Sequence, residues 1–86
     1  MKFEFSEHAK KIMDRRIMPE ALIDEILRSS EQVLERNDKL IFQSRIYLLR
    51  GKRFLFRIYV TKRKPHKVIT VYKTSKIRRY YDSEIR

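Results

Sequence analysis

The sequence predicts an α+β fold, with two N-terminal helices packed on one face of a twisted antiparallel sheet of three to four strands. Apolar residues recur at helical spacing in the first third of the chain, and they alternate with polar residues from Gln32 onward. Turn residues at 37–38 and 50–52 separate the alternating runs. Helices followed by consecutive strands are typical of the α+β class. A length of 86 residues predicts one domain over residues 1–86.

A first helix is predicted after Ser6, which is a favourable N-cap. Residues 2–5 alternate before it and predict a short strand. The apolar stripe of the helix consists of Ala9, Ile12, Met13 and Ile17. At about 100° per residue, Arg16 falls inside this stripe and His8 lies at its edge. Two interpretations of Arg16 are open. Its stem packs along the core edge while its head reaches water, or its head points into a phosphate site.

A second helix is predicted to begin at Pro19, because proline is favoured at the first helical position. Its apolar face consists of Leu22, Ile23, Ile26 and Leu27, and Ser29-Ser30 ends it. Strands are then predicted over residues 33–36, 39–49, 54–61 and 68–73. A basic loop covers residues 62–67, and residues 74–86 form a polar, basic tail.

The two faces of the predicted sheet differ in polarity, as expected for a sheet that helices cover on one side. The inward face carries Phe54, Phe56, Ile58 and Val60. The outward face carries Arg45, Tyr47, Arg57 and Tyr59. Thr70 and Tyr72 join the outward face if Ile69 and Val71 point inward. Val68 competes with those two residues for the inward face, so the parity of the last strand is open at this point.

The charge balance favours a polyanionic partner. Lys plus Arg number 22 and Asp plus Glu number 11, which gives a net charge of +11. Solubility alone needs only about 2 to 8 net charges on a small domain, so we expect nucleic acid binding through phosphate contacts. An acidic protein partner fits the charge equally well. The chain has no Cys, which excludes disulfides and thiolate metal sites. Without a long apolar run we expect no signal peptide, no membrane partner and a cytoplasmic location.

The sequence lacks the motifs of the familiar enzyme classes. The sequence contains no glycine-rich phosphate loop, HExxH motif or nucleophile elbow. His8 and His66 lack a neighbouring carboxylate at ligand spacing, so we expect no metal and no cofactor. Metal-free RNA cleavage needs only a base, an acid and cations around the phosphate. His, Lys, Tyr and Arg can fill these roles. Lys76 and Tyr80 lie four residues apart, on one face of the tail if it is helical.

Two segments resemble a known family. FSEHAKKIMDRRIMPEALIDEIL resembles the opening of a small prokaryotic family of unknown function, whose members begin with a Ser/His/Ala helix, an Arg-Gly-Ile turn and an acidic second helix. KVITVYKTSKIRRYY resembles the end of that family. The resemblance covers residues 3–81. The family is similar to the RelE- and BrnT-like toxins, which are small basic ribonucleases held inactive by a cognate antitoxin.

This resemblance implies a RelE-like fold, metal-independent endoribonuclease activity and an acidic antitoxin as partner. By position, the family's His and Arg correspond to His8 and Arg16. Its terminal strand corresponds to Thr70 and Tyr72, and its closing segment to Thr74, Ser75 and Lys76. Ile17 stands where the family has Gly. Because a β-branched residue is unfavourable at positive φ, we expect either that the turn after the first helix takes another form or that the two helices are spaced differently.

The hypothesis that follows is an endoribonuclease toxin that attacks a phosphate with the adjacent 2'-hydroxyl. The proposed catalytic residues are His8, Arg16, Arg57, Lys76 and Tyr80. His8 and Lys76 are the acid-base candidates, and Arg16 and Arg57 stabilise the phosphate. The proposed RNA-binding residues are Arg45, Tyr47, Tyr59, Thr70, Tyr72 and Arg78. The alternatives are a non-catalytic RNA- or DNA-binding module and a domain that binds an acidic protein.

Overall fold

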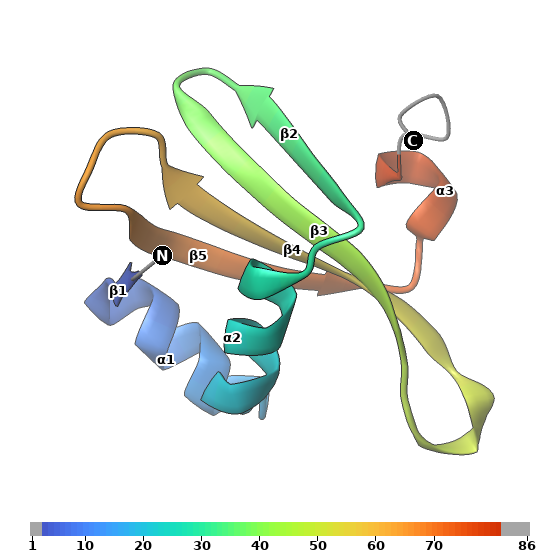
Figure 1. Ribbon diagram of the computed structural model, residues 1–86. Coiled ribbons are helices and arrows are strands. Elements are labelled where there is room, and N and C mark those ends of the chain that lie inside the picture. The colour runs from blue at the N-terminus through green and yellow to red at the C-terminus, as the bar shows by residue number, and fades with distance from the viewer. Residues whose placement is uncertain (1–2, 82–86) are drawn as a thin grey trace.

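The computed structural model describes residues 3–81 and shows an α+β fold with two helices on one face of a curved sheet (Figure 1). The predicted arrangement of N-terminal helices against a sheet is therefore confirmed. The elements are β1 (Glu4–Phe5), α1 (Glu7–Arg15), α2 (Glu20–Arg28), β2 (Gln32–Arg36), β3 (Lys39–Tyr47), a single turn (Leu49–Gly51), β4 (Arg53–Thr61), β5 (Lys67–Thr74) and α3 (Ile77–Tyr80). None of these helices is both long enough and apolar enough to cross a membrane.

The sheet differs from the prediction in strand number and direction. It has five strands in the order β1-β5-β4-β3-β2, and β1 runs parallel to β5 while the other pairs are antiparallel. The prediction of three to four antiparallel strands was therefore incomplete. Residues 4–5 gain strand geometry only by pairing with Lys67 and Val68, more than sixty positions away. Local alternation cannot indicate such a pairing.

Ser6 links α1 to the sheet. Its hydroxyl accepts a hydrogen bond from the Ala9 amide at 3.0 Å and donates one to the Ile69 carbonyl at 3.0 Å. The first bond is the predicted N-cap, which satisfies an amide with no partner inside the helix. The second holds the start of α1 beside β5. Ser6, the N-cap of α1, therefore fixes the position of this helix over the β5 edge.

The turn after α1 corrects the expectation for Ile17. This residue takes φ 54°, so it adopts the left-handed conformation despite its branched side chain. The Met18 amide donates to the Met13 carbonyl at 2.8 Å, and the Ile17 amide donates to the Asp14 carbonyl at 3.3 Å, as in a Schellman motif. Ile17 is 85% exposed and Met18 is buried. Met18 therefore takes the core position that the helical periodicity had assigned to Ile17.

The core lies between the helices and one sheet face. Phe56, Ile58 and Val60 are buried there, with Phe54 packed at the margin, which confirms the predicted inward parity of β4. A shift of register between Tyr59 and Val60 settles the parity of β5. Val60 lies opposite Val68 and Tyr59 opposite Thr70, so Ile69 is the extra residue. Val68 and Val71 both reach the core, and Thr70 and Tyr72 lie on the other face.

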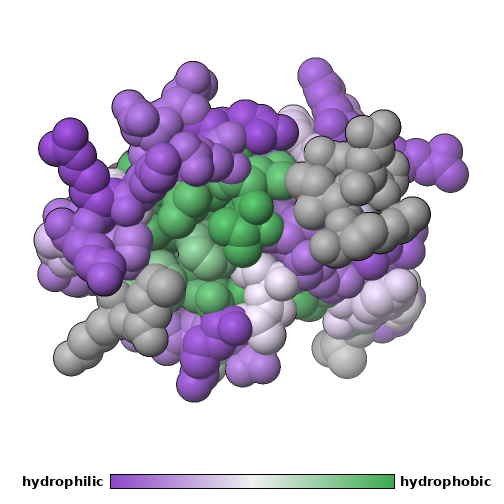
Figure 2. Space-filling view, turned by 45° about the horizontal axis from the view of Figure 1, so that its top comes forward, coloured by the Kyte–Doolittle hydropathy of each residue, from purple (hydrophilic) through white to green (hydrophobic). Residues whose placement is uncertain are grey.

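The second sheet face is not the open polar surface that the sequence predicted. Leu34, Ile41, Leu55, Gln43 and Arg57 are buried on it. The tail accounts for part of this burial, because Tyr80 and Tyr81 contact Gln43, Arg57 and Arg45. A one-turn helix thus covers residues that appear solvent-facing when each strand is considered alone. Elsewhere, hydrophilic side chains surround a central apolar area on the face shown in Figure 2.

Candidate functional site

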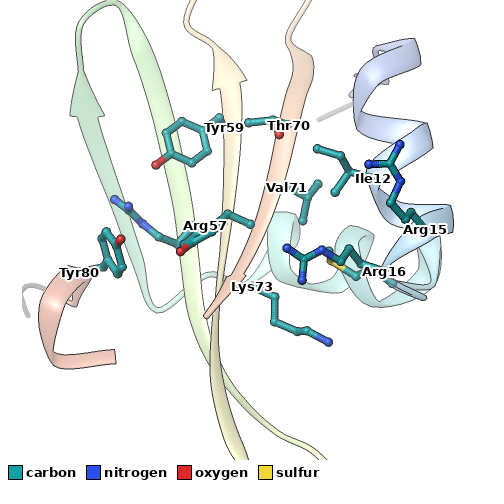
Figure 3. Close-up of a pocket in the computed structure, with 11 residues that line it drawn as sticks. Ile12, Arg15, Arg16, Arg57, Tyr59, Thr70, Val71, Lys73 and Tyr80 are labelled. Atoms are coloured by element: carbon teal, nitrogen blue, oxygen red, sulfur yellow. The ribbon is translucent and has the colours of Figure 1, made fainter. Parts of the chain in front are cut away.

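A cleft of about 440 Å³ lies along β5, between the end of α1 and the second sheet face (Figure 3). Among residues 3–81, β1 pairs only with the first two residues of β5, so the rest of that edge has no strand beside it. The lining residues come from α1, the turn after it, β4, β5 and α3. They are Ile12, Arg15, Arg16, Met18, Arg57, Tyr59, Thr70, Val71, Tyr72, Lys73 and Tyr80.

The cleft is strongly basic. In the described part of the chain, four cations line it, Arg15, Arg16, Arg57 and Lys73, and no Asp or Glu does. Within the described residues, none of the four is in an ion pair with a carboxylate. In Figure 3, Arg16 reaches from the end of α1 toward β5, and Arg57 lies on the other side of that strand. The cations therefore lie on both sides of the β5 edge, and the Arg57 guanidinium is directed away from β5, toward Gln43 and Tyr80.

Arg57 is held in one orientation. The residue is buried, with 8% of its surface exposed, and its Nε donates to Gln43 Oε1 at 2.9 Å. The guanidinium carbon lies 4.6 Å from the ring centre of Tyr80 and 5.5 Å from that of Tyr59. Such contacts restrain a guanidinium group and leave its hydrogen-bond donors directed outward. Its two Nη groups have no hydrogen-bond partner among the described residues and are not sealed from solvent.

Tyr72 and Tyr80 form a pair with different acidities. Their rings meet edge to face with centres 5.9 Å apart. Hydrogen bonding from the Tyr80 hydroxyl lowers the pKa of Tyr72, and Thr74 and the positive charges of Lys76 and Arg79 lower it further, against the effect of burial. The pKa of Tyr80 is raised because its proton is engaged by Tyr72 and because of burial. Tyr72 is therefore the more readily ionised hydroxyl, and Tyr80 the one that keeps its proton.

The structure brings together part of the predicted site. The predicted residues that line the cleft are Arg16, Arg57, Tyr59, Thr70, Tyr72 and Tyr80. Arg15 and Lys73 also line it and were missed by the sequence reasoning. Their adjacency to Arg16 and Tyr72 was the only signal for them. Arg15 lies outside the apolar stripe of the predicted first helix, and residue 73 is the last residue of the predicted strand over 68–73.

Other predicted residues lie outside the cleft. His8 is exposed in the first turn of α1 and does not line it. Lys76 precedes α3 rather than sharing a helix face with Tyr80, because α3 begins at Ile77. Lys76 and Arg78 line a separate hollow together with Arg53. Lys76 still influences the cleft, since its charge lowers the pKa of Tyr72.

Arg45 and Tyr47 have other contacts. Arg45 donates from Nε and Nη2 to the two carboxylate oxygens of Glu31, both at 3.0 Å, and its guanidinium lies 4.3 Å from the Tyr81 ring centre. This ion pair lowers the pKa of Glu31. Tyr47 is exposed at the far end of β3 beside Arg53. Arg45 therefore carries no free charge for a phosphate, and Tyr47 is not part of the cleft.

No metal-ligand cluster is found in the described part of the chain, residues 3–81, where no three His, Cys, Asp or Glu side chains gather. Comparisons with protein-family models, curated proteins and solved structures found no match to this chain. The polar side chains that the described residues contribute to the cleft are four cations, three phenols and the hydroxyl of Thr70.

Proposed function

We propose that this protein binds single-stranded RNA along the β5 cleft and cleaves it without a metal ion, by attack of a 2'-hydroxyl on the adjacent phosphate. The observation that supports this proposal is the convergence of four cations and three tyrosines in one cleft, which no acidic residue between positions 3 and 81 lines. Guanidinium and ammonium groups bind phosphates, and tyrosine rings stack on unpaired bases. A duplex lacks such exposed bases, so this mixture suits a single strand best.

The cleavage step requires a base, an acid and charge stabilisation. We assign the base to Tyr72, whose pKa is lowered, because its phenolate can take the proton of the 2'-hydroxyl. The 2'-oxygen then bonds to phosphorus, and the bond from phosphorus to the 5'-oxygen breaks. Tyr80, whose pKa is raised, donates a proton to the leaving 5'-oxygen. Arg16 and Arg57 stabilise the negative charge that gathers on the phosphate oxygens. The products are a 2',3'-cyclic phosphate and a 5'-hydroxyl end.

The larger role that we propose is that of a cytoplasmic RelE-like toxin with an acidic antitoxin. Two helices on one face of a twisted sheet are compatible with the fold that the family resemblance implies. The net charge of +11 suits an acidic partner. Expression of the protein should then arrest growth, and Arg16→Ala should relieve the arrest while the variant accumulates in folded form. Full toxicity of a folded Arg16→Ala variant would contradict the assignment of Arg16.

A second candidate function is a non-catalytic RNA-binding module. The position of His8 favours it, because neither histidine lines the cleft and proton transfer must depend on tyrosines. Tyrosine is a less common acid-base group near neutral pH than histidine. The binding surface is the same in both proposals, and turnover distinguishes them.

The test is incubation of purified protein with end-labelled single-stranded RNA in EDTA, followed by mapping of the product ends. We expect cyclic phosphate and 5'-hydroxyl ends.

Tyr72→Phe should lower the cleavage rate about 10²- to 10⁴-fold, as expected for loss of a general base. His8→Ala, which alters an exposed residue outside the cleft, should leave the rate unchanged. Cleavage unaffected by Tyr72→Phe would place the base elsewhere. Absence of cleavage together with RNA binding that Arg16→Ala weakens would favour the binding module.

A further inference from the structure

Three polar side chains form a buried row across the second sheet face. Gln32 of β2 lies opposite Gln43 of β3, and Gln43 lies opposite Arg57 of β4. Their exposed fractions are 2%, 0% and 8%. Buried amides at neighbouring sheet positions are costly unless each hydrogen-bonding group is satisfied. The row ends at the cleft, because Arg57 lines it.

The hydrogen bonds fix the orientation of the Gln43 amide. Arginine only donates, so the atom that faces Arg57 Nε at 2.9 Å must be the Gln43 oxygen. The nitrogen Nε2 then faces two acceptors, Gln32 Oε1 at 2.7 Å and the Tyr80 carbonyl oxygen at 3.2 Å. Both protons of Nε2 are thereby used. One amide connects the cleft arginine on one side with the backbone of α3 on the other.

Two features of the cleft depend on this amide. The first is the direction of Arg57, because a guanidinium group bonded through Nε has both Nη groups left for a ligand. The second is the wall of the cleft formed by Tyr80, whose ring lies 4.6 Å from the Arg57 guanidinium carbon. Apolar side chains of similar volume in the row would serve stability about as well, since a buried hydrogen bond mostly replaces one made to water. The main effect of the polar row is therefore on the orientation of Arg57 and the position of Tyr80 in the cleft.

We infer that Gln43 is a positioning residue, which directs the two Nη groups of Arg57 at an RNA phosphate and holds α3 as the wall of the cleft. The identity of the ligand rests on the proposed function above. A phosphate suits this geometry because two adjacent Nη donors match two phosphate oxygens. Gln43 does not touch the RNA and acts through Arg57 and Tyr80. Gln32 supports Gln43 by accepting from the same amide nitrogen.

The positioning can be measured without RNA, by hydrogen exchange of the arginine Nε–H groups in NMR spectra. The wild type should show a slowly exchanging Nε–H signal that disappears in Arg57→Lys and is distinct from the Nε–H of Arg45, which donates to Glu31. Gln43→Leu should increase its exchange rate at least tenfold. Gln43→Glu should restore slow exchange, because a carboxylate accepts from Nε. It should also speed exchange at the Tyr81 amide, which donates to Ile77 within α3, because a carboxylate cannot donate to the Tyr80 carbonyl. Fast exchange of every Nε–H in the folded wild type would overturn the inference.

A double-mutant cycle then tests the effect on binding. Kd for a short single-stranded RNA is measured for Gln43→Leu, Arg57→Met and the double variant. Each single change should raise Kd about tenfold, as loss of one charge-assisted contact does. The double variant should bind more tightly than the product of the two single losses predicts, because part of the effect of Gln43 passes through Arg57. Multiplied losses in the double variant would overturn the inference.

A matched control separates positioning from general loss of structure. Ser44→Ala removes another buried hydrogen bond, to the Glu31 amide, at the next position of β3. It should destabilise the fold to a similar degree and leave both the Nε–H exchange and Kd unchanged. A wild type that fails to bind RNA while its Arg57 Nε–H exchanges slowly would overturn the proposed function and support the positioning by Gln43.

Discussion

At the scale of single residues, Ile17 shows how a local conformation can be imposed by its surroundings. It occupies the C′ position of a Schellman motif with φ 54°, where glycine is usual. Its side chain is 85% exposed, so packing does not compensate for the strain. The burial of Met18 and the hydrogen bonds from residues 17 and 18 maintain the turn instead. The residue type at position 17 therefore does not decide the form of the turn, because its neighbours determine the geometry.

Ile17→Gly should therefore stabilise the protein, by about 1 kcal/mol, because it removes the strain of a branched residue at positive φ. The measurement is the free energy of unfolding in urea. Lys11→Gly, at an exposed position inside α1, serves as control and should cost about 1 kcal/mol. Loss of stability in Ile17→Gly would show that the exposed Ile17 side chain makes a favourable contribution after all.

At the scale of elements, the ion pair of Glu31 and Arg45 connects the start of β2 to β3. The Arg45 side chain binds both carboxylate oxygens, and its backbone amide donates to Glu31 Oε1 at 2.8 Å. The ring of Tyr81, the residue that follows α3, stacks on the same guanidinium group. The ion pair therefore also contacts the end of α3. One carboxylate thus orders a junction between two strands and the tail.

The stability that this pair supplies should depend on pH. Arg45 lowers the pKa of Glu31 in the folded state relative to the unfolded state. The contribution is therefore fully present above the ordinary glutamate pKa, and it is lost as pH falls through the lower folded pKa. Unfolding free energies should show the wild type more stable than Glu31→Gln at neutral pH. The difference should shrink as the pH falls below the ordinary glutamate pKa and disappear below the lower pKa of the folded state.

The control for this prediction is Glu25→Gln. Glu25 is highly exposed and lies 4.0 Å from Arg28, so this pair should add little at any pH. A gap between wild type and Glu31→Gln that stays constant from pH 7 to 3 would mean that the effect is not due to ionisation of Glu31.

At the scale of the whole molecule, the net charge of +11 and the unpaired cations of the cleft act together. The total charge attracts any polyanion at long range, whereas the cleft determines where it is held. If all four cleft cations contact phosphates, the logarithm of the RNA association constant should fall with the logarithm of salt concentration with a slope of roughly −3.

Lys73→Ala should make that slope less steep by about 0.7, the value expected for one phosphate contact on a single strand. Lys62→Ala changes the net charge equally, but Lys62 is paired with Glu35 at 2.6 Å and does not line the cleft. It should leave the slope nearly unchanged. Equal slopes for both variants and the wild type would show that Lys73 makes no phosphate contact.

The sequence by itself determined the local features of this protein. Helical spacing, the Ser6 cap and the alternation of β4 are set by contacts within a few residues, and the structure has them. Part of the candidate site was also predictable, because Arg57, Tyr59, Thr70 and Tyr72 share a sheet face once strand parity is known. Arg16 was marked by its position inside an apolar stripe.

Only the tertiary structure decided where these segments meet. The pairing of β1 with β5, the burial of Arg57 beneath α3 and the Gln32-Gln43-Arg57 row all join residues distant in the chain. Periodicity reports only which side of its own element a residue lies on. It cannot show that a tail crosses a sheet, so neither the burial of Gln43 nor the place of Lys73 in the cleft was predictable. Side-chain chemistry could be read from the sequence, and the cleft arose from the packing of α1, β5 and α3.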